Sequence, residues 1–120
     1  MGSLKQHSDA VESIGFSHTV PMIASAGLDG KLNIWDSNTL QLRQTSTHDE
    51  GIVKLMWFPS VPIVATASLD ATLRIWDARN GACVKTFQGH QDAILDFEIS
   101  PDEKFIVSGS DDGSSLVFQI

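Results

Sequence analysis

Side chains that could carry acid–base or nucleophilic chemistry recur at a fixed spacing along this chain. A histidine is followed first by a serine or threonine and then by an aspartate, and the pattern occurs three times with the same two offsets. Serine hydrolases use these residue types for nucleophilic attack. A catalytic site, however, is not repeated at intervals of 41 and 42 residues, so we favour a structural role for these sets. They are His7, Ser25 and Asp29; His48, Thr66 and Asp70; and His90, Ser108 and Asp112.

The segment SLDATLRIWD, residues 68–77, indicates where these sets come from. GLDGKLNIWD lies 41 residues before it, and SDDGSSLVFQ lies 42 residues after it. A period near 40 residues with a Trp-Asp ending is a signature of repeat proteins. The residues of the three sets therefore belong to three copies of one unit.

The runs between the turns have the length and composition of β-strands. They are four to eight residues long and rich in Val, Ile, Thr, Phe and Trp, and no stretch keeps a helical period over about eleven residues. We predict an all-β chain organised as one domain with three units, at about residues 7–47, 48–89 and 90–120. The third unit reaches only its third strand, so its outer strand is expected to be missing.

Gly-His and Trp-Asp pairs delimit the units. They are Gly89-His90, Trp35-Asp36 and Trp76-Asp77. With these pairs in phase, the chain resembles the WD40 repeat family, whose repeats form the four-stranded blades of β-propellers. The resemblance implies a partial propeller of three antiparallel blades, the third without its outer strand.

The resemblance also implies a structural role for the sets of His, hydroxyl and Asp, which in this family join a tryptophan in a buried hydrogen-bonded chain. Trp35 completes the first set and Trp76 completes the second. Such a chain satisfies polar groups that would each cost about 1–3 kcal/mol if buried without a partner. Phe118 stands in place of the third tryptophan and has no donor for Ser108. We therefore predict that the third blade is the least protected.

Three blades are fewer than the four to eight that typically close a propeller. Either the chain is a piece of a longer protein, or copies of it associate edge to edge to complete a ring. We favour the first origin and also predict self-association, with the N-terminal Leu4-Lys5-Gln6 lying along the third blade of another copy.

Charge and cysteine content limit the classes of partner. Fifteen Asp and Glu against eight Lys and Arg give a net charge of −7, which repels nucleic acid and anionic lipid and attracts basic proteins. The alternative is that this acidity serves solubility alone. No run of 18 apolar residues is present, so membrane insertion is not expected. Cys83 is the only cysteine; we expect it to be buried in a strand, in a protein of the cytoplasm or also of the nucleus.

The sequence also lacks the motifs of metal and cofactor sites. No Cys–His spacing resembles a zinc site, and the glycines form no phosphate-binding loop. We therefore expect no metal, no cofactor and no enzymatic activity.

The candidate partner-binding residues follow the repeat histidines. Asp9, Glu50 and Asp92 occupy equivalent positions, so we expect them to cluster on one face and to attract Lys- and Arg-rich protein segments. Asp49, Asp96 and Asp111 are expected to add to this face, and Trp57 is expected in the core. The alternative is that this loop position merely tolerates polar residues.

The sequence thus predicts a non-catalytic interaction scaffold or chaperone-like platform with an acidic face and a basic protein partner. Residues 48–100 resemble a smaller group of WD40 proteins, which implies escort of ribosomal proteins in ribosome assembly and, in animals, a role in cell migration. The alternative is a purely structural part of a larger propeller, whose binding face lies in other repeats.

Overall fold

Eleven antiparallel strands account for the secondary structure of residues 6–120, the part of the chain that our computed structural model describes, and no helix occurs there. The first sheet, or blade 1, contains β1 (Val11–Phe16), β2 (Met22–Gly27), β3 (Lys31–Asp36) and β4 (Leu42–Thr47). Blade 2 contains β5 (Ile52–Trp57), β6 (Ile63–Ser68), β7 (Leu73–Asp77) and β8 (Ala82–Phe87). Blade 3 contains β9 (Ile94–Ile99), β10 (Phe105–Ser110) and β11 (Ser115–Gln119).

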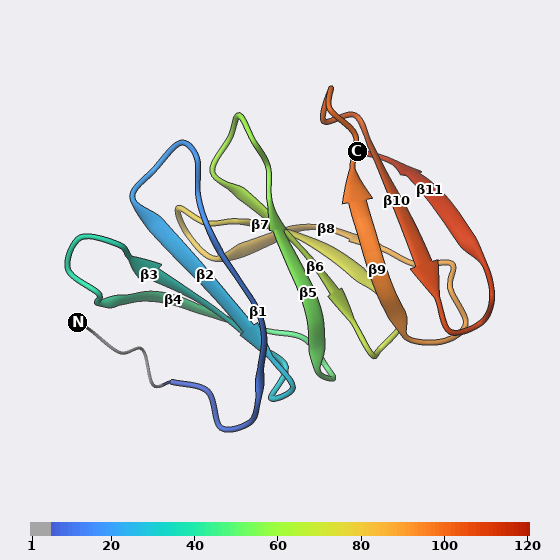
Figure 1. Ribbon diagram of the computed structural model, residues 1–120, viewed down its shortest axis with the longest axis horizontal. Helices are drawn as coiled ribbons and strands as arrows, with labels where there is room; N and C mark the ends of the chain where they lie inside the picture. Colours follow the sequence, from blue (N-terminus) through green and yellow to red (C-terminus); the bar gives the residue numbers. More distant parts are fainter. Residues whose placement is uncertain (1–5) are drawn as a thin grey trace.

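Each blade is a simple meander of neighbouring strands. The order is β1-β2-β3-β4 in blade 1, β5-β6-β7-β8 in blade 2 and β9-β10-β11 in blade 3, with every pairing antiparallel. The first strands of the blades face one another, since β1 contacts β5 and β5 contacts β9, and Figure 1 shows the three sheets side by side around them. The predicted all-β partial propeller with a three-stranded third blade is confirmed.

Two apolar layers between the blades form the core. Between blades 1 and 2, the alanines of β2 face Leu55 and Trp57 of β5. Between blades 2 and 3, Ala65 and Ala67 of β6 face Phe97 of β9. Small residues on one sheet leave room for large residues of the next, which gives the close packing of protein interiors.

Trp57 lies in this core, as predicted. It is buried, and its indole nitrogen donates a hydrogen bond of 2.9 Å to the carbonyl of Gly15 in the neighbouring blade. A Cβ atom added to Gly15 would lie 3.4 Å from the Trp57 ring. The glycine therefore lets the indole approach the backbone of β1.

The predicted burial of Cys83 is wrong. Cys83 lies on β8, the outer strand of blade 2, and is exposed together with most of that strand. This outer strand lies at the edge of its sheet, paired with β7, and within residues 6–120 nothing buries its first five residues. The predicted N-terminal contact of Leu4 and Lys5 lies outside the described residues. In residues 6–120 there is also no apolar helix of the length that a lipid bilayer requires.

Candidate functional site

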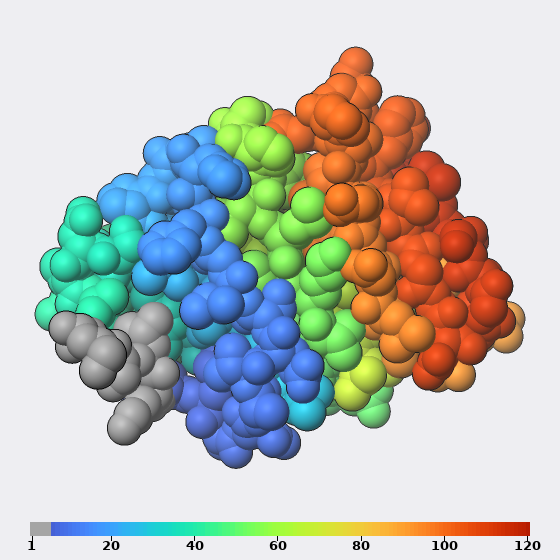
Figure 2. Space-filling view, viewed as in Figure 1, coloured from blue at the N-terminus to red at the C-terminus, as the bar shows by residue number. Residues whose placement is uncertain are grey.

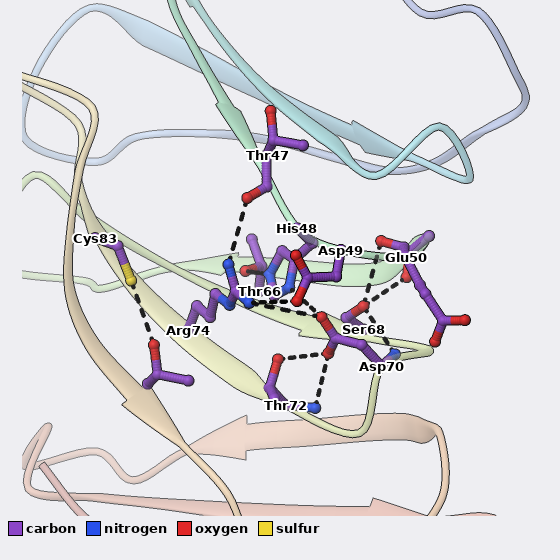
Figure 3. Close-up of polar contacts among 12 residues, drawn as sticks. Thr47, His48, Asp49, Glu50, Thr66, Ser68, Asp70, Thr72, Arg74 and Cys83 are labelled. Carbon is purple, nitrogen blue, oxygen red and sulfur yellow. Dashed lines mark hydrogen bonds and ion pairs between the residues drawn. The ribbon is translucent and has the colours of Figure 1, made fainter.

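The second set of His, hydroxyl and Asp forms a hydrogen-bonded chain with Trp76. The indole nitrogen of Trp76 donates to Oγ1 of Thr66 at 2.8 Å, and Nε2 of His48 lies 2.5 Å from the same oxygen. On the other side of the ring, Nδ1 of His48 lies 3.4 Å from a carboxylate oxygen of Asp70. Figure 3 shows His48, Thr66 and Asp70 converging at the end of blade 2.

The first set has the same arrangement in blade 1. Oγ of Ser25 accepts a hydrogen bond from the indole of Trp35 at 3.0 Å and lies 2.8 Å from Nε2 of His7. Nδ1 of His7 lies 3.0 Å from Asp29. The structure therefore brings together all four residues of each of the first two sets.

These hydroxyls are poorly placed to act as nucleophiles. Ser25 and Thr66 are buried, and each oxygen lies between an indole and an imidazole. A catalytic nucleophile must reach a substrate as well as its base. The hydroxyls instead provide hydrogen-bond partners for the buried indole and imidazole nitrogens, and this stabilises the blade.

The third set differs because Phe118 has no hydrogen-bond donor. Nε2 of His90 lies 2.6 Å from Oγ of Ser108, while the rings of His90 and Phe118 meet in a T-shaped arrangement at a centroid distance of 6.4 Å. Nδ1 of His90 lies 3.0 Å from Oγ of Ser114 and 3.4 Å from Asp112. The sequence analysis did not single out Ser114. It could have done so, because Ser114 is the repeat equivalent of Thr72 and also carries a hydroxyl.

We expect backbone amides of β10 to exchange with solvent faster than those of β6. Ser108 has one side-chain partner where Thr66 has two, and blade 3 has an exposed outer face. Amide exchange reports local opening strand by strand. Hydrogen exchange measured by NMR will test this, and equal protection of β6 and β10 would show that the missing indole bond has no local effect.

The aspartates of the sets hold the turn between the second and third strands of each blade. Asp70 accepts a hydrogen bond from the backbone N–H of Thr72, and Asp112 does so from Ser114. Asp112 also accepts from the N–H of Gln91, which joins this turn to the loop after His90. The hydroxyl of Ser114, followed by these backbone donors, lowers the pKa of Asp112.

Burial and hydrogen bonding shift the pKa of Asp70 in opposite directions. Burial is the largest single influence and raises the pKa of this carboxyl. The side-chain and backbone bonds from Thr72, together with the neighbouring His48, outweigh it, so the pKa of Asp70 is lowered. The aspartate is thus held as an anion within the turn.

The loops that precede β1, β5 and β9 lie on the same side as these turns. In each blade a backbone bond joins them, from Leu28 to Ala10, from Leu69 to Gly51 and from Asp111 to Ala93. Figure 1 shows these strand ends and turns along the lower side of the molecule. We call this side the acidic face, and define it by the loops at 7–10, 48–51 and 90–93 and the turns at 28–31, 69–72 and 111–114.

The acidic face carries eight of the fifteen carboxylates. Asp9, Glu50 and Asp92 are exposed on it at equivalent places in the three blades, and Asp49 and Asp111 are exposed beside them. Asp96, which was expected to add to this face, instead pairs with Lys54 between β5 and β9. The full set of acidic residues is Asp9, Asp29, Asp49, Glu50, Asp70, Asp92, Asp111 and Asp112.

Charges on the opposite side of the blades are paired or engaged in turns. Asp36 lies 3.3 Å from Arg43, and Asp77 lies 2.8 Å from Arg79. Asp102 accepts hydrogen bonds from the Ser100 hydroxyl and the backbone of its own turn. On the acidic face half of the carboxylates are likewise paired with a histidine or with Arg74. Within residues 6–120 no ion pair is found for the other four, Asp9, Glu50, Asp92 and Asp111.

Arg74 is a cation at this face that the sequence reasoning missed. Its guanidinium donates to the carbonyl of Thr47 at 3.3 Å and lies 3.6 Å from Asp49 and 3.8 Å from Asp70, as Figure 3 shows. The positive charge sits between blades 1 and 2. Comparison of the repeats could not predict this cation, because the equivalent residues in the other two copies are Asn33 and Leu116.

The family model described as "WD domain, G-beta repeat" matches residues 1–36, 40–77 and 81–118. The chain belongs to the WD40 repeat family. Each of the last two WD40 matches starts before an outer strand, β4 or β8, and ends in the third strand of the next blade. A WD40 repeat in this chain therefore supplies one strand to the preceding blade and three to its own.

Several WD40 proteins are similar over nearly the whole chain. Angio-associated migratory cell protein of Homo sapiens is 41% identical over 114 residues, which cover 95% of this chain and 26% of that protein, and the Canis lupus familiaris protein gives the same values. An uncharacterized WD repeat-containing protein of Schizosaccharomyces pombe is 36% identical over 118 residues, or 98% of this chain and 30% of that protein. The chain spans about a quarter to a third of the length of these relatives.

These similarities confirm the predicted family and the narrower resemblance within it. The smaller group that residues 48–100 resemble is the one represented by angio-associated migratory cell protein. WD40 repeat proteins generally act as non-catalytic scaffolds that bind other proteins.

Proposed function

We propose that this chain is part of a protein-interaction platform whose acidic face binds basic segments of other proteins. The observation that supports this is the unequal distribution of charge between the two sides of the blades. The acidic face has eight carboxylates and two cations, Lys31 and Arg74. Four of these carboxylates have no ion pair within residues 6–120, whereas Asp36 and Asp77 on the opposite side are each paired with an arginine. A surface of one sign attracts partners of the other sign.

The equivalent carboxylates give this surface a regular geometry. The side chains of Asp9 and Asp92 each accept a hydrogen bond from the following backbone N–H, at 2.8 and 2.9 Å, which fixes them at the start of the first strands. Glu50 has the same place in blade 2 and is exposed. An extended Lys- and Arg-rich segment that crosses the three blades would meet one carboxylate per blade.

We propose basic proteins such as ribosomal proteins as the clients, and the cytoplasm, with the nucleus, as the location. The resemblance in the sequence implies the ribosomal clients, and the acidic face has the complementary charge. The name of the human relative connects that protein with cell migration, and we extend this role to the present chain as a proposal.

Neutralising the three carboxylates is expected to weaken binding of a basic peptide about tenfold, because exposed charge pairs contribute about 0.2–1 kcal/mol each. The variant is Asp9→Asn, Glu50→Gln and Asp92→Asn, in which Asn keeps an oxygen that can accept the N–H bond. Titration with a peptide of alternating lysine and glycine, at low and at physiological salt, will measure the change.

A control of equal charge change places lysines on the opposite side of blade 1, at the exposed residues His18, Thr19 and Asn38. Global attraction predicts the same loss in the control as in the test variant. Binding at the acidic face predicts a loss only in the test variant. Equal losses, or none, would contradict the proposal and favour the second candidate function, a purely structural part of a larger propeller.

We propose in addition that copies of this chain associate with one another. Within the described residues β11 pairs only with β10, so one edge of blade 3 presents unpaired backbone groups. Unpaired strand edges promote association between chains.

A further inference from the structure

Seven of the twelve large apolar side chains exposed in residues 6–120 lie on two sheet faces at opposite ends of the molecule. The first face belongs to blade 1 and points away from blade 2. The second belongs to blade 3 and points away from blade 2 in the other direction; Figure 2 shows the two end blades separated by the middle one. The face of blade 1 carries Val11, Ile14 and Phe16, and that of blade 3 carries Leu95, Phe105, Val107 and Val117.

Each of these faces has a buried counterpart within the chain. Phe16 is 67% exposed, whereas Trp57, its equivalent in the next repeat, is 6% exposed because it packs on blade 1. Val117 is 64% exposed, whereas Ile75, its equivalent in the preceding repeat, is 3% exposed because it packs on blade 3. The two exposed faces are therefore the two halves of a contact that the chain already makes twice.

The exposed face of blade 3 also has a hollow. At the equivalent place on blade 2, a large side chain of blade 3 packs against the sheet. A pocket there is lined by Phe97, Val107, Gly109 and Ser115, among others. A Cβ atom added to Gly109 would have no neighbour within 4 Å. In blade 2 the equivalent residue Ala67 is covered by the apolar cluster that contains Phe97. Ile14 is the blade 1 equivalent of Phe97, so it is the side chain that would enter this hollow.

We propose that a second copy of this chain stacks its blade 1 face on the blade 3 face of the first copy. This inference rests on the proposed self-association and assigns it to sheet faces instead of strand edges. Contacts of this head-to-tail kind close into a ring when the rotation allows. Two copies present six blades, which is within the range of four to eight for propellers.

Glu98 limits the strength of this contact. It is exposed on the blade 3 face, at the position where blade 2 has Met56, and Met56 packs against the core cluster between blades 2 and 3. A carboxylate desolvated against Ile14 and Phe16 would disfavour the contact. Glu98→Met is therefore expected to tighten self-association, with a dissociation constant at least tenfold lower than that of the unchanged chain.

The test is the molar mass in light scattering or analytical ultracentrifugation over a range of protein concentrations. The unchanged chain is expected to approach twice its 13.0 kDa with increasing concentration. Phe16→Lys and Val117→Lys are each expected to remain monomeric. Val84→Lys is the matched control, because Val84 is 56% exposed on the outer strand β8, away from both faces.

A mixture of the two monomeric variants distinguishes this contact from others. Phe16→Lys keeps an intact blade 3 face, and Val117→Lys keeps an intact blade 1 face, so the mixture is expected to form a dimer through one contact. Contact between two copies of the same face would not give this result, and a monomeric mixture would overturn the inference.

Two further outcomes separate this inference from the proposed self-association. If both lysine variants dimerise as the unchanged chain does, the copies join through strand edges, and the face assignment is wrong while self-association stands. If the unchanged chain and Glu98→Met both stay monomeric at the highest concentration reached, self-association and its face assignment both fail.

Discussion

Thr66→Val is expected to lower the free energy of unfolding by about 2–6 kcal/mol, because it leaves two buried polar groups without a partner. Valine has nearly the shape of threonine, but it lacks the oxygen that bonds both the indole of Trp76 and the imidazole of His48. Both side chains are buried. Each polar group left buried in this way costs about 1–3 kcal/mol.

Urea unfolding followed by circular dichroism will measure this loss, with the slope of the transition checked for an unchanged denatured state. The first and third blades provide a matched pair of controls. Ser25→Ala removes the partner of Trp35 but leaves Nε2 of His7 in contact with Asn33 at 3.3 Å, and Ser108→Ala removes the partner of His90. We expect each of these losses to be about half that of Thr66→Val, because each variant leaves one orphaned group instead of two. A Thr66→Val loss below about 1 kcal/mol would contradict the importance of the buried chain.

Acidification from pH 7 to pH 4 is expected to destabilise the chain by about 3 kcal/mol through His48 alone. Burial, the largest influence, lowers the pKa of His48 from 6.5 to about 4, against the opposing attraction of Asp70. The unfolded chain binds this proton below about pH 6.5, whereas the folded chain binds it only near pH 4. His48 therefore does not reduce the free energy of unfolding above pH 6.5, and it reduces this free energy increasingly as the pH falls from 6.5 toward 4. Each unit of difference between the two pKa values corresponds to about 1.4 kcal/mol.

The measurement is the free energy of unfolding at several pH values between 7 and 4, for the unchanged chain and for His48→Gln. Comparing the two curves isolates His48 and its interaction with Asp70, because the substitution removes only these two contributions. The lowered pKa values of Asp70 and Asp112 act below their usual value of 3.8, outside this window. We expect a flatter curve for His48→Gln, and parallel curves would show that His48 is protonated equally in both states.

The residues repeated at equal spacing were the part of this structure that could be predicted from the sequence. The three sets of His, hydroxyl and Asp recur at the same spacing as the strands around them. Each copy could therefore be aligned with the next, and the alignment predicted which residues are equivalent. The burial of Trp57 followed from its place in the first strand of a blade.

Features that differ between the copies could not be found in this way. Arg74 has Asn33 and Leu116 as its equivalents, and its contacts with Thr47 and Asp49 join two blades. The pairing of Lys54 with Asp96 likewise depends on how β5 and β9 meet. Cys83 lies in a run whose composition suits either an inner or an outer strand, and only the packing of the sheets leaves that run uncovered. Contacts between blades are set by their relative placement, which a repeat period does not encode.

The offset between repeats and blades has a consequence for how such a chain can change in length during evolution. Each repeat gives its first strand, such as β4 or β8, to the blade before it and keeps three strands for its own. A duplicated repeat inserted between two others would donate its first strand to the preceding blade and receive the first strand of the repeat that follows. Gene duplication in units of one repeat, about 40 residues, can therefore add whole blades while every existing strand keeps a pairing partner.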